Sequence, residues 1–340
     1  MKSALVIGDG QIGREIASQL SAAGIRTSVA TRSTPPPAPV EVGAGKIHTT
    51  QASGSAADRT STAAPRTPGP VSPPRTEVAR VRADAADPAQ LLEAAAGTDI
   101  IFACVHAPYD SRVWGQVLPP LEKTIMDVGA KLGIPVIFPE SVYAFAGLTT
   151  SVSESSPFAP VEEKGRIRQQ LMEARSAHGA RTASVIAGDL VGETAQPNSS
   201  VVKMCISDRI GQGRRAIVPA RTDVPHGITV IADLAAAMIG AARSLEADNA
   251  AEHRLFLAPA SNPTLADIAA FTYSYLGIPA RRPIALPRWT TRVAGLVERS
   301  MFELHELSPI WYQPCIIETG ELADEVGTTR WQDGIIAMLL

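Results

Sequence analysis

The chain has 340 residues, with 31 Lys and Arg against 34 Asp and Glu and a formal net charge of −3. This length is enough for a nucleotide-binding domain and a smaller second domain around one extended core. Without an excess of positive charge, nucleic acid and anionic membranes are poor partners, and small-molecule chemistry is favoured. No apolar run reaches the roughly 18 residues of a membrane helix, and the first residues indicate a strand rather than a signal peptide.

The three cysteines, Cys104, Cys205 and Cys315, stand far apart and lack C-x-x-C or Cys/His ligand spacing. This spacing predicts neither a disulfide framework nor a metal site. We therefore expect a cytoplasmic protein that holds no metal.

Strands and helices alternate through the first half of the chain. The apolar run at 4–7 predicts a buried strand, and the helical period that follows it ends at Gly24. Further strands are expected at 27–31, 78–82, 100–105, 135–138 and 182–186, with helices at 88–96, 121–132 and 162–178. This alternation predicts an α/β Rossmann fold with a doubly wound parallel sheet.

Two parts of the chain depart from this alternation. Residues 33–76 are crowded with Pro, Ser, Thr, Ala and Gly, which predicts a flexible surface insertion rather than a packed unit. Beyond residue 186 helices and short strands mix. We therefore expect a dinucleotide-binding domain at 1–186 and, at 187–340, a mixed α/β substrate lobe that returns some elements to the Rossmann core.

A dinucleotide fingerprint, GDGQIG, lies between the first strand and the first helix. Gly8 permits the tight turn, Gly10 lets the backbone approach a pyrophosphate, and Gly13 lets the helix pack closely on the strand. The helix N-terminus adds free N–H groups and a positive dipole for the phosphates. The predicted cofactor-binding residues here are Gly8, Gly10, Gln11, Ile12 and Gly13.

The choice of cofactor depends on the end of the second strand. A carboxylate there binds the ribose 2'-hydroxyl of NAD, whereas an arginine accepts the 2'-phosphate of NADP. The chain has Arg32 at this place and no acid nearby, which favours NADP(H), although a solvated loop arginine would look the same. Asp84, after the third strand, is placed either to hydrogen-bond the adenine edge or to cap a turn.

These segments together resemble the extended short-chain dehydrogenase/reductase family, also called the NAD-dependent epimerase/dehydratase family, over nearly the whole chain. The matching segments are GDGQIG, ADAADPAQLLEAAAGTDIIFACVHAPY, IPVIFPESVYAFAG, SPFAPVEEKGRIR, DVPHGITVIADLAAAMIGAA and RRPIALPRW. The set is most similar to the atypical branch, because Ile7 replaces the first glycine of the usual G-x-x-G-x-x-G. The resemblance implies an enzyme for a small-molecule substrate, with a possible homodimer formed through the helices at 121–132 and 162–178.

The resemblance also locates a change in the catalytic residues. Members of the family carry a Ser or Thr after strand five and a Tyr-x-x-x-Lys whose Tyr is the general acid/base, while the Lys lowers its pKa and binds the nicotinamide ribose. Lys164 matches that Lys, but Pro160 stands in place of the Tyr and Pro139 in place of the Ser. Proline has neither a hydroxyl nor an N–H and cannot transfer a proton.

The first hypothesis for such a site is an NADP(H)-dependent oxidoreductase or epimerase-like enzyme whose proton donor has moved. Tyr143, just beyond strand five, is the leading candidate, with a pKa lowered by Lys164. Tyr143 could equally pack beneath its loop with its hydroxyl satisfied. Ser141 and Glu140 are weaker candidates.

The second hypothesis is a non-redox isomerase, lyase or cyclase in which His106, Tyr109 and His226 act, although a lone histidine is more often structural. The third is a nucleotide-sensing binding protein. We favour redox chemistry because the resemblance implies it.

Aromatic side chains that could line an organic pocket, or simply belong to the core, are Trp114, Phe145, Trp289 and Trp311.

Overall fold

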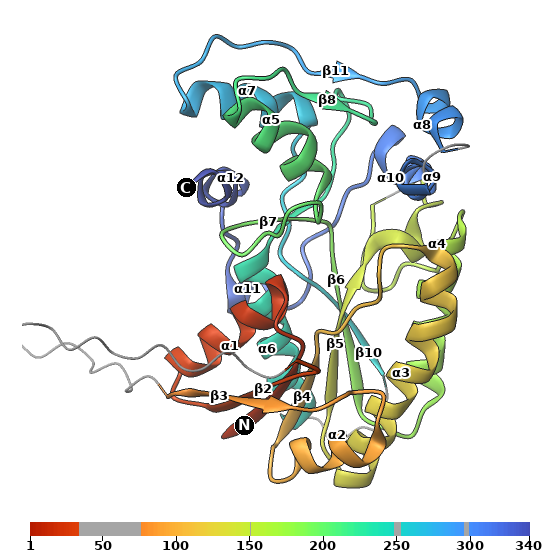
Figure 1. The fold of residues 1–340 in the computed structure, drawn as a ribbon, viewed down its shortest axis with the longest axis vertical. Coiled ribbons are helices and arrows are strands. Elements are labelled where there is room, and N and C mark those ends of the chain that lie inside the picture. The colour runs from red at the N-terminus through yellow and green to blue at the C-terminus, as the bar shows by residue number, and fades with distance from the viewer. Residues whose placement is uncertain (34–75, 150, 248–252, 296–298) are drawn as a thin grey trace, which may run out of the picture.

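A computed structural model describes residues 1–33, 76–149, 151–247, 253–295 and 299–340. In this part of the chain a seven-stranded parallel sheet, in the order β10-β6-β5-β4-β1-β2-β3, forms the centre of a Rossmann fold (Figure 1). Its strands are β1 (Ser3–Ile7), β2 (Arg26–Thr31), β3 (Val78–Arg82), β4 (Ile100–Ala103), β5 (Val136–Ser141), β6 (Thr182–Ala187) and β10 (Arg254–Leu257). The fold class predicted from the sequence is confirmed.

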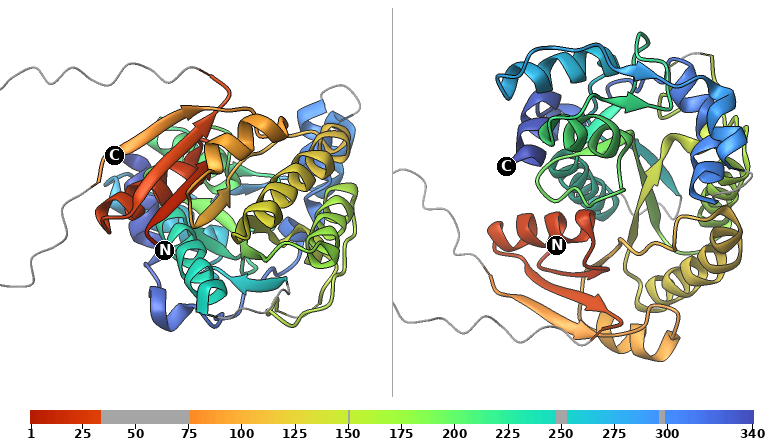
Figure 2. Two further views of the ribbon diagram at one scale, coloured as in Figure 1. Left: turned by 90° about the horizontal axis from the view of Figure 1, so that it is seen from below. Right: turned by 45° about the horizontal axis from the view of Figure 1, so that its top comes forward.

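Helices cover both faces of this sheet, as Figures 1 and 2 show. On one face lie α1 (Gln11–Ala22) and α6 (Ile231–Ala247), and on the other α2 (Pro88–Ala95), α3 (Ser111–Leu132) and α4 (Glu163–Ala177). Successive strand residues point to opposite faces. In β1, Ala4 and Val6 therefore join the core under α1 and α6, while Leu5 and Ile7 join the core under α2 and α3. Burial on both faces explains why the strand is an unbroken apolar run.

A smaller lobe stands above the carboxyl ends of the strands (Figure 1). Two short parallel pairs, β7 with β9 and β8 with β11, are surrounded by helices. Its elements are β7 (Asp189–Val191), η2 (Lys203–Ser207), α5 (Asp208–Gly211), β8 (Ile217–Val218), β9 (Ile228–Val230), α7 (Leu265–Tyr275), β11 (Ile284–Ala285), α8 (Arg288–Ala294), α9 (Arg299–His305), α10 (Ser308–Tyr312) and α12 (Trp331–Leu339). The short α11 (Ala323–Val326) packs on α6, so α6, α11 and β10 return to the Rossmann core.

The start of α3 corrects the sequence prediction, since the helix begins at Ser111 rather than at 121. Pro119 and Pro120 lie inside it, where proline normally removes a backbone hydrogen bond and breaks the helix. Both prolines lie on the exposed face, so water can reach the carbonyl groups one turn earlier. The opposite face is buried through Trp114, whose packing outweighs the unfavourable prolines.

Other boundaries shift by a few residues. The strand expected at 135–138 continues to Ser141 as β5, and the strand expected at 100–105 ends at Ala103 as β4. The expected insertion at 33–76 lies almost entirely outside the described residues. No helix in the described part of the chain combines the length and the apolar character needed to cross a membrane. All three cysteines are free thiols.

Candidate functional site

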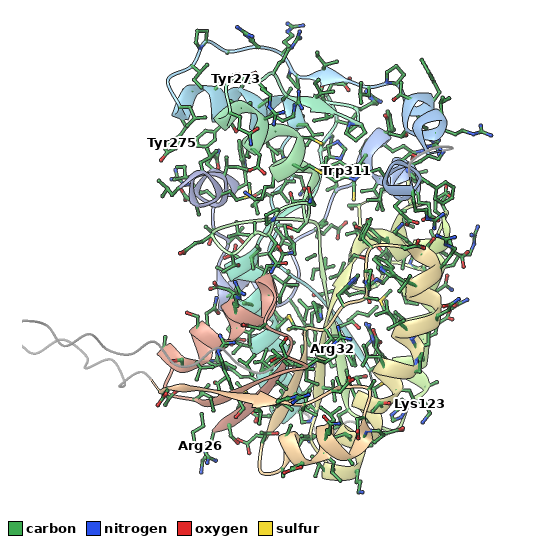
Figure 3. The ribbon with its side chains drawn as sticks, in the orientation of Figure 1. Arg26, Arg32, Lys123, Tyr273, Tyr275 and Trp311 are labelled. Carbon is green, nitrogen blue, oxygen red and sulfur yellow. The ribbon has the colours of Figure 1, made fainter. Side chains whose placement is uncertain are left out.

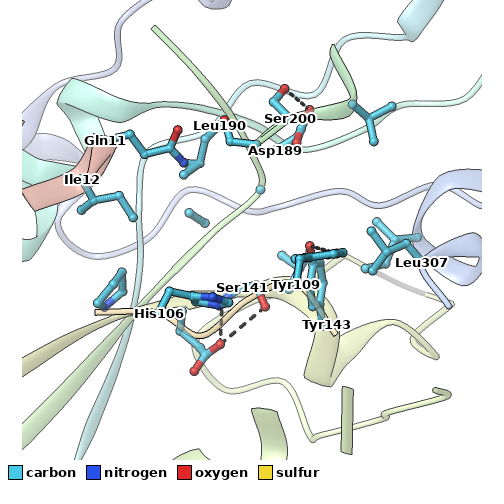
Figure 4. A pocket seen from close by; sticks show the side chains of 18 of the residues that line it. Gln11, Ile12, His106, Tyr109, Ser141, Tyr143, Asp189, Leu190, Ser200 and Leu307 are labelled. Atoms are coloured by element: carbon cyan, nitrogen blue, oxygen red, sulfur yellow. Dashed lines mark hydrogen bonds between the residues drawn. The ribbon is translucent and has the colours of Figure 1, made fainter. Parts of the chain in front are cut away.

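A cavity of about 510 Å³ lies between the carboxyl edge of the sheet and the lobe (Figure 4). It starts at the first turn of α1, passes the ends of β4 and β5, and reaches α10. Most of the predicted catalytic residues and His226 line it, and Gly10, Gln11 and Ile12 of the fingerprint line its other end. The structure thus joins the predicted nucleotide site and the predicted catalytic residues in one space. The lining residues that the sequence analysis named are Gly10, Gln11, Ile12, Cys104, His106, Tyr109, Trp114, Pro139, Glu140, Ser141, Tyr143, His226, Trp311 and Cys315.

The fingerprint glycines have the geometry that a dinucleotide requires. Gly8 has a φ of 102°, and a Cβ there would lie 2.7 Å from the carbonyl oxygen of Cys104. A Cβ at Gly13 would overlap the Gly8 carbonyl oxygen, so the helix and the strand pack in direct contact. At Gly10, by contrast, no described atom lies within 4 Å of a Cβ position. This open space in front of the α1 N-terminus fits a pyrophosphate group.

Charged side chains surround the place where the adenosine ribose would lie. Arg32 is exposed at the carboxyl end of β2 (Figure 3). Asp9, inside the fingerprint, accepts a hydrogen bond from Arg80 Nη1 at 2.6 Å and lies 3.5 Å from Arg14 Nε. The sequence analysis did not identify this cluster. The available signals were Asp9 inside the fingerprint and the arginines at alternate positions of β3, Arg80 and Arg82. The carboxylate of Asp84 accepts a backbone N–H two residues later at 3.0 Å, as a turn residue does.

Two tyrosine hydroxyls meet in the cavity. Tyr143 lies on η1 (Val142–Phe145), and its hydroxyl is 3.1 Å from that of Tyr109 (Figure 4). The Tyr143 ring stacks on Trp114 with ring centroids 6.3 Å apart and an interplanar angle of 7°. Burial raises the pKa of both phenols, although Tyr109 as a whole residue is 46% exposed. The prediction that Lys164 lowers the pKa of Tyr143 is therefore wrong, and both groups are protonated near neutral pH.

Lys164 faces the lobe rather than the cavity. Its buried ammonium donates to Glu306 Oε2 at 2.8 Å and pairs with Glu303, both at the end of α9 or just beyond it. The Lys164 Nζ also lies 4.7 Å from the centre of the Tyr109 ring. A role at the nicotinamide ribose, as the resemblance implies, would require α9 to release this ammonium.

Arg168, one helical turn beyond Lys164, is a site residue that sequence reasoning missed. The residue is buried, with 7% of its surface exposed, and its guanidinium lies 4.5 Å from the Trp114 ring centre. Its Nη2 is 2.6 Å from His106 Nε2. Its Nε lies 3.4 Å from a Glu140 oxygen, and this Nε has no hydrogen-bond partner among the described residues. The i, i+4 spacing from Lys164 was the available signal, because it places both residues on one side of α4.

His106 is held as a neutral imidazole. Its Nδ1 donates to the carbonyl oxygen of Ala107 at 2.6 Å, which leaves Nε2 to accept from Arg168. Desolvation by the surrounding protein, together with the charge of Arg168, lowers the pKa of His106 to about 4. His226 is also buried, its Nε2 donates to the Arg221 carbonyl at 3.2 Å, and burial lowers its pKa. Neither histidine carries a proton to donate as an imidazolium at neutral pH.

Glu140 belongs to a buried ion-pair network rather than to the reacting groups. Its second oxygen accepts from Arg175 at 3.0 Å, and Arg175 also binds Glu122 through two bonds of 2.8 Å. Each charge in this network has a partner, as buried charges require. Ser141 donates its backbone N–H to Glu140 at 2.8 Å, and its hydroxyl lies 3.5 Å from the same oxygen.

Asp189, the first residue of β7 and two residues beyond the end of β6, is a second site residue that the sequence analysis did not identify. Its carboxylate accepts from Ser200 Oγ at 2.7 Å and from the Val202 N–H at 3.0 Å (Figure 4). Burial nevertheless raises the pKa of Asp189 to about 6. Its position at the carboxyl edge of the sheet, where ligands bind, was the signal that could have found it.

Two of the four aromatic residues proposed to line a pocket do so, and two lie elsewhere. Trp114 and Trp311 line the cavity. Phe145 packs in the core, with its ring centre 5.4 Å from that of Phe158. Trp289 is 64% exposed on α8.

Comparison with known proteins gives a fold and no closer relationship. No protein-family model and no curated protein sequence matches the chain. Three similar solved structures are MoeE5 in complex with UDP-glucose and NAD (14% identity, TM-score 0.64), UDP-glucose 4-epimerase from Thermotoga maritima with UDP-glucose (12%, 0.66) and UDP-glucose 4-epimerase from Thermus thermophilus with NAD (16%, 0.65). In each case 99% of this chain and 97% of the other are covered. These structures confirm the fold that the family resemblance implies.

Proposed function

We propose that the chain is an NADP(H)-dependent oxidoreductase or epimerase-like enzyme of the extended short-chain dehydrogenase/reductase type, acting on a small organic molecule. The observation that carries this proposal is the pair of hydroxyls of Tyr109 and Tyr143, 3.1 Å apart in a cavity that continues to the dinucleotide fingerprint. A proton donor beside a nicotinamide site is the minimum that carbonyl reduction requires. The fold likeness to proteins crystallised with NAD supports a nicotinamide cofactor.

The residues of the chain would hold the cofactor in two places. The amides at the α1 N-terminus, behind Gly10, would bind the pyrophosphate, and Arg32 would bind a 2'-phosphate. When bound, the cofactor supplies the hydride that reduces a carbonyl carbon. The preference for NADP over NAD rests on Arg32, since the similar structures were determined with NAD.

Tyr143 would act as the acid in this reaction. Because burial raises its pKa, the phenol keeps its proton until a stronger base, the alkoxide that develops on the substrate oxygen, takes it. The phenolate left behind is then stabilised by a hydrogen bond from Tyr109, which opposes the effect of burial on the pKa of Tyr143. The chain thus replaces the missing Tyr and Ser of the family pattern with two tyrosines from different segments.

The proposal is tested by following the absorbance of NADPH during incubation with a panel of aldehydes and ketones. One NADPH should be consumed for each alcohol formed. Conversion of a substrate with no net change in NADPH absorbance would exclude net reduction, and would leave an epimerase-like reaction or the non-redox hypothesis. Tight NADPH binding without any conversion would favour a sensor. A cytoplasmic location and a homodimer stay predictions.

A further inference from the structure

The cavity has two chemically different walls. The wall formed by the Rossmann domain carries the tyrosine pair, Arg168 and His106. Besides the polar side chains of Asp189, Gln196, Asn198, Ser199, Ser200 and His226, the wall formed by the lobe carries large apolar side chains from η2, α9, α10 and the residues beside them. These are Val201, Met204, Leu304, Leu307, Ile310 and Trp311. A ligand seated against these apolar side chains must present apolar surface to them.

Positive charge is scarce in this cavity. Among the described residues that line it, Arg168 is the only Lys or Arg, while Glu140 and Asp189 contribute carboxylates. Arg168 lies on the Rossmann wall, where its guanidinium packs on the Trp114 ring and already lies beside the carboxylate of Glu140. A buried phosphate without a cation loses its hydration with no compensating ion pair. A diphosphate at the lobe wall would in addition meet the carboxylate of Asp189.

We propose that the substrate is a largely apolar ketone or aldehyde without phosphate groups, and that the site does not accept nucleotide-sugars. The carbonyl oxygen would be received by Tyr143 and Arg168, and the apolar remainder would lie against Leu307 and Trp311. This inference rests on the proposed function, because it assigns the reacting carbonyl to the tyrosine pair. It separates the chain from the similar structures, two of which hold UDP-glucose.

The geometry around Arg168 supports an oxygen ligand at this end. The guanidinium is oriented by three neighbours, through its stacking on Trp114, its bond to His106 and its contact with Glu140. A group whose orientation is fixed in advance loses little entropy when it binds. Its Nε is buried without a hydrogen-bond partner among the described residues, which a structure tolerates rarely unless a ligand compensates.

Titration calorimetry with two probes tests the inference independently of turnover. The protein is saturated with NADP⁺, which cannot reduce a ketone, and is titrated with benzylacetone and with UDP-glucose. Benzylacetone should give saturable binding, and UDP-glucose should give none over the same concentration range. Leu307→Arg, which places a cation in the apolar wall, should weaken benzylacetone about tenfold or more, because an apolar contact is lost. Val293→Arg adds the same cation at a 55% exposed position of α8 outside the cavity; it is the matched control and should bind benzylacetone like the wild type.

Each outcome separates this inference from the proposed function. Saturable binding of UDP-glucose, or failure of both probes to bind, overturns the substrate class. Binding of benzylacetone with no consumption of NADPH in the turnover assay leaves the substrate class standing and removes the redox function. Conversion of UDP-glucose that requires NADP⁺ leaves the redox function standing and removes the substrate class. Circular dichroism melts of both variants establish that they are folded before their affinities are compared.

Discussion

Replacing Tyr143 with Phe removes one hydroxyl and keeps the ring that stacks on Trp114. Loss of a positioned general acid costs about 10² to 10⁴ in rate, so kcat with saturating NADPH and a ketone should fall by that order. Tyr109→Phe removes only the hydrogen bond to Tyr143 at 3.1 Å. Such a bond contributes about 0.5 to 1.5 kcal/mol, which corresponds to roughly a 2- to 10-fold loss in rate.

The pH profile adds a second readout. Because burial raises the pKa of Tyr143, the donor stays protonated on the alkaline side of neutrality, and the wild-type rate should not fall until the pH exceeds the usual tyrosine value of about 10. Tyr275→Phe is the matched control, since Tyr275 is 43% exposed on α7, away from the cavity (Figure 3). NADPH affinity should be unchanged in all three variants. Full activity in Tyr143→Phe, together with loss of activity on substitution of His106 or Tyr109, would refute the assignment.

Three further expectations concern the cofactor, the insertion and pH. Arg32→Ala should lower NADPH affinity about tenfold or more and spare NADH, because a charge-assisted contact to phosphate contributes about 1.5 to 3 kcal/mol; equal affinities of the wild type for the two nucleotides would contradict this. Deletion of 36–74 should leave a folded, nucleotide-binding protein, because the segment has too little apolar surface to offset its ordering entropy; a large fall in melting temperature would argue for packing. Burial raises the pKa of Asp189 to about 6, so the folded state holds a proton that the unfolded state releases. The free energy of unfolding should therefore fall by about 2 to 3 kcal/mol as pH rises from about 4 to about 6. The free energy of unfolding is measured by urea titration at several pH values across this range, and for Asp189→Asn it should lack this fall. The same dependence of the free energy of unfolding on pH in the variant and the wild type would contradict the prediction.

Features that depend on neighbouring residues could be predicted from the sequence. The strand at Val78–Arg82 has the predicted bounds, and Asp87 caps α2 by accepting the N–H groups of Ala89 and Gln90. Capping and alternation act over a few residues, so the sequence displays them directly. Gly13 of the fingerprint is of the same kind, because a Cβ there would overlap the carbonyl oxygen of Gly8, five residues earlier in the same turn.

Features that depend on contacts between distant segments could not be predicted from the sequence. Arg168 and His106 are separated by 62 residues, and Lys164 and Glu303 by 139. Only the fold decides which of the many charged side chains become partners. The same reason explains α3, because nothing near Pro119 and Pro120 in the sequence indicates that the buried face of the helix will outweigh them.

The position of Lys164 connects the altered sequence to the altered site. In the family pattern a lysine four residues after a tyrosine activates that phenol, but Pro160 offers no phenol here. The ammonium instead neutralises Glu303 and Glu306, and Arg299 of the same helix binds Asp110 at 3.0 Å. These ion pairs tie the lobe to α3 and α4, and they leave Arg168 to face the cavity. We therefore place the proton donor at Tyr143, whose phenol holds a proton at neutral pH and has the Tyr109 hydroxyl, rather than an ammonium, as its hydrogen-bond partner.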